Sequence, residues 1–226
     1  MKRAAIGVRA HSGWGAVVAV GEETASRHGA RRGGGPEVLA RERVSVVEPR
    51  MVRPGIRGAA QPFGGSFRLR TRITAQPYHH VEGWKIPAAE KYLAECEAIG
   101  RKLAAAALRK MSDELHARGY SVAGCAVLAG SGRPLPELAK ILAAHPLIHT
   151  AEGIFFRRVF QDACEGLGWR VTRVREKELD AAAKLALGAD AARAKRAIAG
   201  MGKKIGAPWT ADQKMAALAA WMVIRG

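Results

Sequence analysis

The chain has 226 residues and a formal net charge of +17, from 37 Lys and Arg against 20 Asp and Glu. Hydrophobic residues make up 48% of it and charged residues 25%, as in folded globular proteins, so the composition excludes a wholly disordered chain. Its 3 widely spaced cysteines imply no disulfide framework, and no stretch has the roughly 20 consecutive apolar residues of a membrane span.

These bulk properties favour one domain and a polyanionic partner. A chain of this length forms one domain more readily than two, so we expect a single domain over residues 1–226. Basic side chains that contact phosphates release counterions, which makes nucleic acid, DNA or RNA, the first candidate partner. A solvated basic surface is the alternative. We expect a cytoplasmic protein that makes no membrane contact and has buried cysteines; its oligomeric state, a homodimer included, is left open.

Three β-prone segments open the chain. Residues 4–8 and 16–20 are short apolar runs, and the glycines and serine between them favour a hairpin turn. Apolar and polar residues alternate over 38–47, which predicts a third strand. We therefore expect an antiparallel meander of three strands.

Two basic segments rich in glycine and arginine interrupt and follow these strands. We expect residues 22–36 and 49–77 to form flexible loops or an insertion, with a short ribbon at 66–74, because their composition cannot bury a core. The second segment contains no acidic residue. Its candidate nucleic-acid-binding side chains are Arg50, Arg53, Arg57, Arg68, Arg70 and Arg72.

Helices and strands alternate in the next part of the chain. Apolar residues recur at helical spacing over 88–118, and Gly119 follows as a stop. The continuous apolar run at 122–128 is typical of a buried parallel strand. We expect a short helix over 135–144 and a longer one that starts near Pro146.

The C-terminal part continues the alternation. Residues 169–174 predict a fifth strand, and residues 176–204 predict one or two helices broken near Gly188 and Gly200. Thr210 and Gln213 have the spacing of a capping box, so the last helix begins there. The resulting order, three antiparallel strands followed by helix–strand alternation, predicts an α/β fold of the ribonuclease H-like plan, with a mixed five-stranded sheet flanked by helices.

Residues 148–224 also resemble a known family. His149-Thr-Ala-Glu-Gly-Ile-Phe-Phe and the Leu-Gly-Trp that follows resemble the helix and turn that lead into the fifth strand of RuvC-type Holliday-junction resolvases. Glu176-Lys-Glu-Leu resembles the short helix after that strand, and Pro208-Trp-Thr-Ala-Asp-Gln resembles the start of the family's Ala-rich final helix. The resemblance covers roughly a third of the chain and is one of pattern more than of identity.

The resemblance implies a centre of four carboxylates around two Mg²⁺ or Mn²⁺ ions. This chain lacks most of these carboxylates. Arg9 lies at or next to the position where the family has its first-strand acid, and Ala-Gly-Ser-Gly at 129–132 lies where the fourth-strand acid would be. Of the paired acids in the last helix, Asp212 is present and Met215 takes the second place. One carboxylate cannot hold two divalent cations, which need several anionic oxygens.

Other polar side chains could form a different site at the same end of the sheet. His11 lies on the first hairpin, and His149 and Glu152 lie at i, i+3 on one helix. We name His11, His149, Glu152 and Asp212 as candidate catalytic residues. Of these, the candidate metal ligands are His149, Glu152 and Asp212. His79 and His80 could reach the same rim, and backbone amides around Ser131 could bind a phosphate.

Each of these residues also has a structural explanation. His149 and Glu152 could be a surface pair, His79 and His80 loop residues, and the turn at Ser131 an ordinary tight turn; Asp212 could stabilise the start of its helix through the helix dipole.

Two functions therefore remain. The first is a RuvC-like nucleic-acid-binding protein, either degenerate or an atypical metal-dependent nuclease. The alternative is a non-catalytic ribonuclease H-fold protein that binds a protein partner or a small anionic ligand.

Overall fold

The computed structural model describes residues 1–22, 34–48, 51, 76–130, 132 and 134–226. Some of the predictions fall outside this part of the chain. They are most of the two expected flexible loops at 22–36 and 49–77, the ribbon at 66–74, the six candidate phosphate-binding arginines from Arg50 to Arg72, and Ser131.

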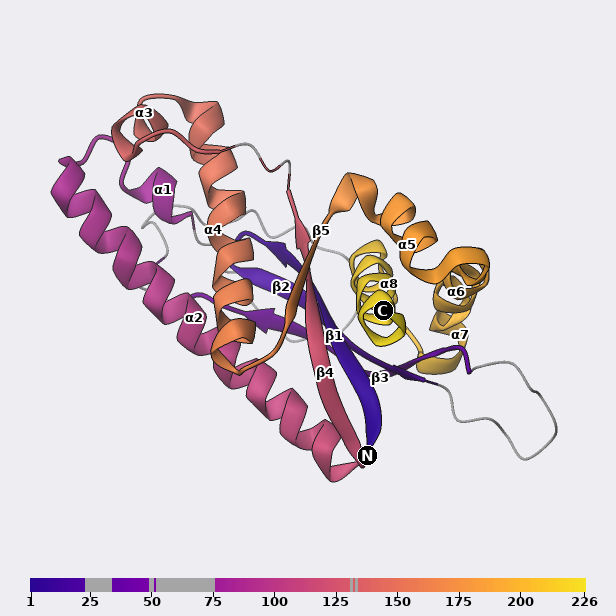
Figure 1. Ribbon diagram of the computed structural model, residues 1–226. Coiled ribbons are helices and arrows are strands. Elements are labelled where there is room, and N and C mark those ends of the chain that lie inside the picture. The colour runs from indigo at the N-terminus through magenta and orange to yellow at the C-terminus, as the bar shows by residue number, and fades with distance from the viewer. Residues whose placement is uncertain (23–33, 49–50, 52–75, 131, 133) are drawn as a thin grey trace, which may run out of the picture.

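The described strands form one mixed sheet with the order β3-β2-β1-β4-β5 (Figure 1). β1 pairs with β2 and β2 with β3 in antiparallel fashion, while β4 is parallel to both β1 and β5. This order and these directions are those of the ribonuclease H-like fold, so the fold prediction is confirmed. The strands are β1 (Lys2–His11), β2 (Trp14–Glu22), β3 (Pro36–Ser45), β4 (Tyr120–Ala129) and β5 (Val171–Arg175).

Helices cover both faces of this sheet. α2 and α4 pack on one face, where their apolar stripes meet alternate residues of β1 and β2 in one core cluster. α5, α6 and α8 cover the other face and form a second cluster. The helices are α1 (Pro77–His80), α2 (Ile86–Ala117), α3 (Leu138–Leu142), α4 (His145–Gly166), α5 (Leu179–Leu187), α6 (Ala191–Gly200), α7 (Gly202–Ile205) and α8 (Ala211–Arg225), with 3₁₀ turns η2 (Glu176–Glu178) and η3 (Gly188–Asp190).

Local signals in the sequence account for several helix ends. Gly188 has a positive φ of 54° and ends α5, and the Thr210 side chain accepts from the Gln213 backbone N–H in the predicted capping box of α8. One segment differs from its prediction. Pro77, expected at the end of the flexible loop 49–77, instead begins α1, because proline suits a first helical turn and the turn packs against α2 and α4.

The cysteines are buried, as predicted. Cys96, Cys125 and Cys164 form no disulfide within the described structure, and the Sγ atoms of Cys125 and Cys164 lie 3.0 Å apart between β4 and α4. The hydrogen bond between these two thiols, together with burial, raises the pKa of Cys125 well above its ordinary value. These side chains therefore behave as small hydrophobic groups of the core.

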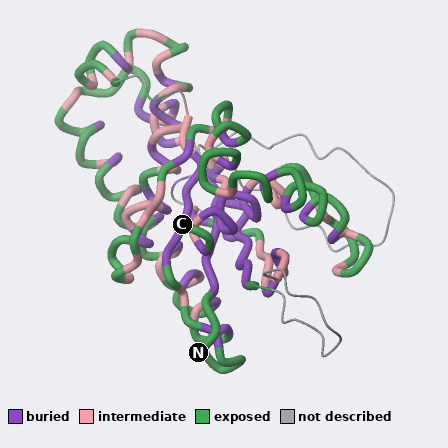
Figure 2. Tube along the Cα trace, turned by 45° about the vertical axis from the view of Figure 1, so that its right-hand side comes forward, coloured by how far each residue is buried: buried purple, intermediate pink, exposed green. Residues whose placement is uncertain are grey.

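A close approach of α8 to the central strand fixes the second core cluster. A Cβ atom built on Gly7 of β1 would overlap the backbone carbonyl group of Ala216 in α8. The central part of α8 is buried (Figure 2) and presents the small residues Ala216, Ala217, Ala219 and Ala220, which let the helix lie this near to the sheet. Glycine at position 7 is thus a steric requirement.

We expect Gly7→Ala to lower the free energy of unfolding by about 3 kcal/mol, because the added methyl group meets backbone that no side-chain rotation can move. Urea denaturation measures this loss. Gly166→Ala is the matched control, since a Cβ at Gly166 has no neighbour within 4 Å, and its effect should stay within about 1 kcal/mol. Equal stabilities of the two variants would contradict the packing described.

Candidate functional site

Arg9 lies at the centre of a group of charged side chains near the end of β1. Side chains alternate along a strand, so Ala5, Gly7 and Arg9 face α8 while Ile6 and Val8 face the α2–α4 layer. The Arg9 guanidinium donates to Glu176 Oε2 at 2.8 Å and forms a second ion pair with Asp212 Oδ1. The hydrogen bond to Glu176 is the largest cause that raises the pKa of Arg9, which therefore stays charged.

Glu176 and Asp212 reach Arg9 from two different elements. Glu176 is the first residue of η2, immediately after β5, and Asp212 lies in the first turn of α8. Arg157 of α4 adds a second guanidinium, with Nη2 3.6 Å from Glu176 Oε1. Two guanidinium groups thus face two carboxylates. We call Arg9, Arg157, Glu176, Asp212 and the neighbouring His11 the Arg9 centre.

His11 joins this centre through Asp212. Its Nε2 atom lies 3.2 Å from Asp212 Oδ2, and its ring stacks on Trp14 with centroids 4.3 Å apart. The Arg43 guanidinium lies 3.5 Å from the centroid of Trp14, so Trp14 stands between His11 and Arg43 in a row across β1, β2 and β3. Burial lowers the pKa of His11, and the Arg9 charge acts in the same direction, against Asp212.

The charge balance of the Arg9 centre does not suit Mg²⁺ or Mn²⁺, the cations that the resemblance implies. Such ions need several carboxylate oxygens, and here two carboxylates are already paired with guanidinium groups. The guanidinium of Arg9 itself supplies the positive charge between Glu176 and Asp212. We therefore derive no metal-dependent step at this centre.

A second group of polar side chains lies where α1 packs on α4. His145 and His149 are one turn apart on α4, with Nε2 atoms 3.0 Å apart, and His79 of α1 meets both rings. Among the described residues, a search for His, Cys, Asp and Glu side chains that could hold one metal ion together finds these three histidines. We call them the histidine cluster.

Glu152 lies beneath the histidine cluster and is 3% exposed. Its Oε1 atom accepts from the backbone N–H of Tyr78 at 2.8 Å and of His79 at 3.2 Å. Burial raises the pKa of Glu152 to about 8, although these two backbone hydrogen bonds act in the opposite direction. The carboxylate thus ties α1 to α4.

The structure divides the predicted site residues between the two groups. His11 and Asp212 belong to the Arg9 centre, whereas His149 and Glu152 belong with the histidine cluster. His149 precedes Arg157, the α4 residue of the Arg9 centre, by eight positions, which is about 12 Å along a helix. The predicted ligand set of His149, Glu152 and Asp212 is therefore not one site. The four residues remain proposals within two separate groups.

Sequence reasoning missed Glu176, Arg157 and His145, although it expected that His79 could reach the same rim as His149. A signal for Glu176 was present, because it follows the end of a strand parallel to β4, the edge at which α/β folds place ligands.

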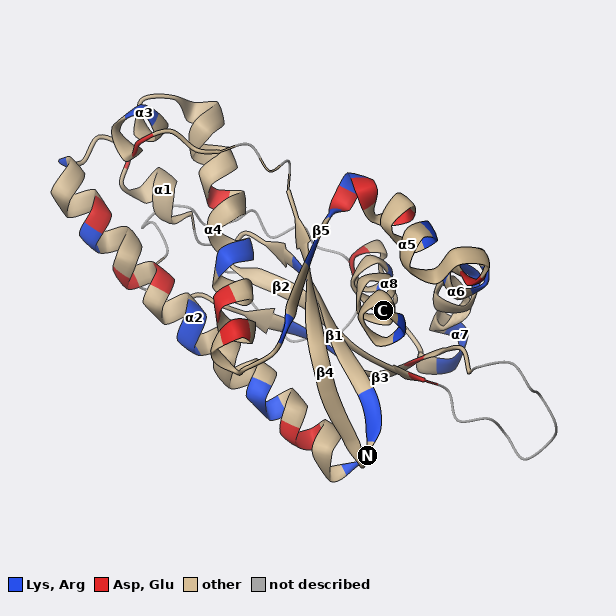
Figure 3. Cartoon of the chain, in the orientation of Figure 1, with Lys and Arg blue, Asp and Glu red and all other residues tan. Residues whose placement is uncertain are grey.

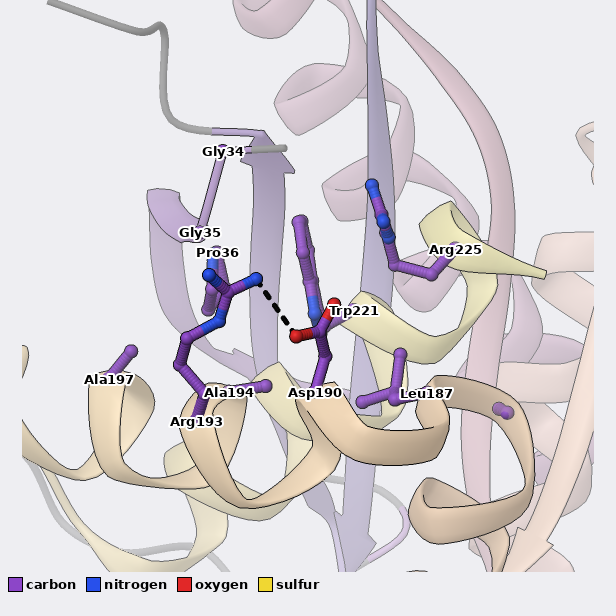
Figure 4. A pocket seen from close by; sticks show the side chains of 11 residues that line it. Gly34, Gly35, Pro36, Leu187, Asp190, Arg193, Ala194, Ala197, Trp221 and Arg225 are labelled. Carbon is purple, nitrogen blue, oxygen red and sulfur yellow. Dashed lines mark ion pairs between the residues drawn. The ribbon is translucent and has the colours of Figure 1, made fainter. Parts of the chain in front are cut away.

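A pocket of about 360 Å³ lies between the start of β3 and helices α6 and α8 (Figure 4). Asp190 and Arg193 form an ion pair there, and its described lining contains none of the predicted site residues.

Comparisons with known proteins find structural likeness without sequence likeness. Neither family models nor curated protein sequences match the chain. The Thermus thermophilus RuvC structure is 14% identical with a TM-score of 0.43, and the match covers 97% of this chain and 92% of that one. T. thermophilus RuvC in complex with a Holliday junction substrate is 12% identical with a TM-score of 0.44, covering 97% and 91%. The assignment to the ribonuclease H-like fold rests on the strand order and directions given above. No helix among the described residues is long and apolar enough to cross a membrane.

Replacing Arg9 tests the charge balance of its centre. We expect Arg9→Asp to lower the free energy of unfolding by about 2 kcal/mol, because three carboxylates then face one another, and we expect Mg²⁺ to restore part of this loss. Thermal unfolding with and without Mg²⁺ measures both effects. Arg9→Gln, which removes the guanidinium without adding a carboxylate, is the control and should gain less from Mg²⁺. An equal Mg²⁺ response in the wild type would show that a divalent cation already binds there.

The His11 pKa tests the electrostatics of the same centre. We expect a value below 6.5 by NMR titration, and a further decrease in Asp212→Asn, because that variant removes the carboxylate that favours imidazolium. Below 6.5 the unfolded chain binds a proton that the folded protein still excludes, so the contribution of His11 to stability falls as the pH drops through this window. A pKa at or above 6.5, or an increase in Asp212→Asn, would contradict the arrangement described.

Proposed function

We propose that the protein binds nucleic acid and does not cleave it by two-metal chemistry at the Arg9 centre. The absence of two-metal cleavage is inferred from the guanidinium of Arg9, which is ion-paired between Glu176 and Asp212. In-line phosphoryl displacement by two metals requires cations between carboxylates. A fixed arginine at that position supplies charge but neither a metal-bound nucleophile nor a Lewis acid.

The charge distribution supports nucleic acid as the partner. The chain carries a formal charge of +17, and the arginines between residues 50 and 72 have no acidic neighbour in that segment. Among the described residues, Arg173 and Arg175 are exposed on β5, the edge strand next to β4 (Figure 3), and Arg170 is exposed immediately before it; Arg175 also pairs with Glu178 at 3.1 Å. Basic side chains along an edge and in an acid-free segment suit the regularly spaced phosphates of a backbone.

This proposal predicts binding that weakens steeply with salt and depends on where the arginines lie. Fluorescence anisotropy with branched DNA, single-stranded DNA and RNA at several salt concentrations measures it. Replacing the six arginines from Arg50 to Arg72 by Gln should weaken binding at least about ten-fold and reduce the salt slope by about 0.9 per lost contact to duplex phosphate.

A matched control removes the same number of positive charges elsewhere. Its residues are exposed on α2 and α5, and we expect a smaller loss when they are replaced by Gln: Lys91, Arg101, Lys102, Arg109, Lys110 and Lys184. An equal loss of affinity in the two variants would show that binding depends on net charge and not on the position of the arginines. Salt-independent or undetectable binding would instead favour the alternative of a protein or small-anion partner.

The same samples test cleavage. Incubation of each nucleic acid with the wild type in Mg²⁺ or Mn²⁺ should leave it intact, because the Arg9 centre does not suit either ion. Cleavage that disappears in Asp212→Ala would overturn this part of the proposal and show that the centre holds metal in the presence of substrate.

A further inference from the structure

The histidine cluster brings three imidazoles to one point from distant parts of the chain. The ring centroids of His79 and His149 are 4.6 Å apart, those of His145 and His149 are 4.5 Å apart, and those of His79 and His145 are 5.2 Å apart. One ligand nitrogen from each residue lies within 4.8 Å of the others. The i, i+4 spacing on α4 directs His145 and His149 to one side of the helix, where α1 places His79.

Apolar packing does not explain this convergence. His145 and His149 are exposed, so their rings are not needed to fill a core. The Nε2 atoms of His145 and His149 lie at hydrogen-bond distance, 3.0 Å apart. That hydrogen bond accounts for one pair of rings, whereas a shared electron-pair acceptor would account for all three, His79 included.

The distances suit a tetrahedral metal ion. Zinc binds imidazole nitrogen at about 2.0–2.1 Å, which separates two ligand nitrogens by about 3.3 Å in a tetrahedron. The 3.0 Å between the Nε2 atoms of His145 and His149 is close to this value, and small rotations would bring the third nitrogen to it. An all-imidazole set favours Zn²⁺ over Mg²⁺ or Mn²⁺, which prefer oxygen.

Glu152 supplies the outer partner that metal-bound histidines usually have. Its Oε1 atom lies 3.3 Å from Nδ1 of His79 and also accepts from the His79 backbone N–H. A carboxyl oxygen that accepts from Nδ1 places the ring proton there, which makes Nε2 the nitrogen that would bind a metal, and it orients the ring. The other oxygen, Oε2, is buried and has no hydrogen-bond partner within the described structure.

We propose that His79, His145 and His149 bind one Zn²⁺ ion, with Glu152 as the positioning residue of His79. Three protein ligands leave a fourth coordination position, which opens to solvent beside the exposed His145 and His149 and is available to water or an oxyanion. The ion would cross-link α1 to α4. This site is separate from the Arg9 centre and does not depend on nucleic-acid binding.

Zinc titration of the chelator-treated full chain tests the site. Competition with a fluorescent chelator should give one equivalent of bound Zn²⁺ with a dissociation constant in the micromolar range or below. His145→Ala and His149→Ala should each weaken binding about 100-fold. Both side chains are exposed, so circular dichroism should show that both variants remain folded. His116→Ala, which removes an exposed histidine at the end of α2, is the matched control and should bind as the wild type does.

Cobalt replaces zinc in a second measurement that reports on geometry. Co²⁺ should give the intense visible bands of four-coordination in the wild type and lose them in His149→Ala. Glu152→Gln should keep one equivalent of metal but bind it about ten-fold more weakly, with altered Co²⁺ bands. The proposal is overturned if no one-to-one Zn²⁺ site is found, or if His145→Ala and His149→Ala bind zinc as tightly as His116→Ala does.

Discussion

The contact between Gly7 of β1 and Ala216 of α8 is the constraint on which much of this molecule depends. Because position 7 has no side chain, the last helix lies directly against the central strand, and its alanines fill the narrow space between them. Asp212 lies one helical turn before Ala216, and Arg9 lies two residues after Gly7 on the same side of β1. The packing that stabilises the core therefore also sets the distance between the charges of the Arg9 centre.

The two polar groups carry different chemistry. In the Arg9 centre, ion pairs balance the charges of Arg9, Glu176, Asp212 and the Arg157 side chain from α4, although Nε of Arg9 and Nε of Arg157 have no hydrogen-bond partner within the described structure. Where α1 packs on α4, the buried Glu152 side chain and three imidazoles lie together. The zinc ion that we propose would bind in this second group.

Much of the fold could be predicted from local sequence signals. The β1–β2 hairpin, the length of α2 and the capping box of Thr210 and Gln213 follow from periodicity and capping, which act over a few residues. The sites were less predictable because they depend on contacts between distant residues. The histidine cluster required α1, a single turn after a glycine- and arginine-rich segment, to pack against α4, and no local pattern records that contact. The sequence shows Glu176 just after a predicted strand. Its role was not predicted, because its partner Arg9 lies where the family has an acidic residue.

The arginine at position 9 also changes how this centre relates to its surroundings. A divalent ion held by carboxylates exchanges with the cellular metal pool, and chelators or competing ions can remove it. A guanidinium on a central strand is part of the polypeptide and cannot dissociate. The positive charge between Glu176 and Asp212 is therefore encoded in the gene, and its presence does not vary with metal supply.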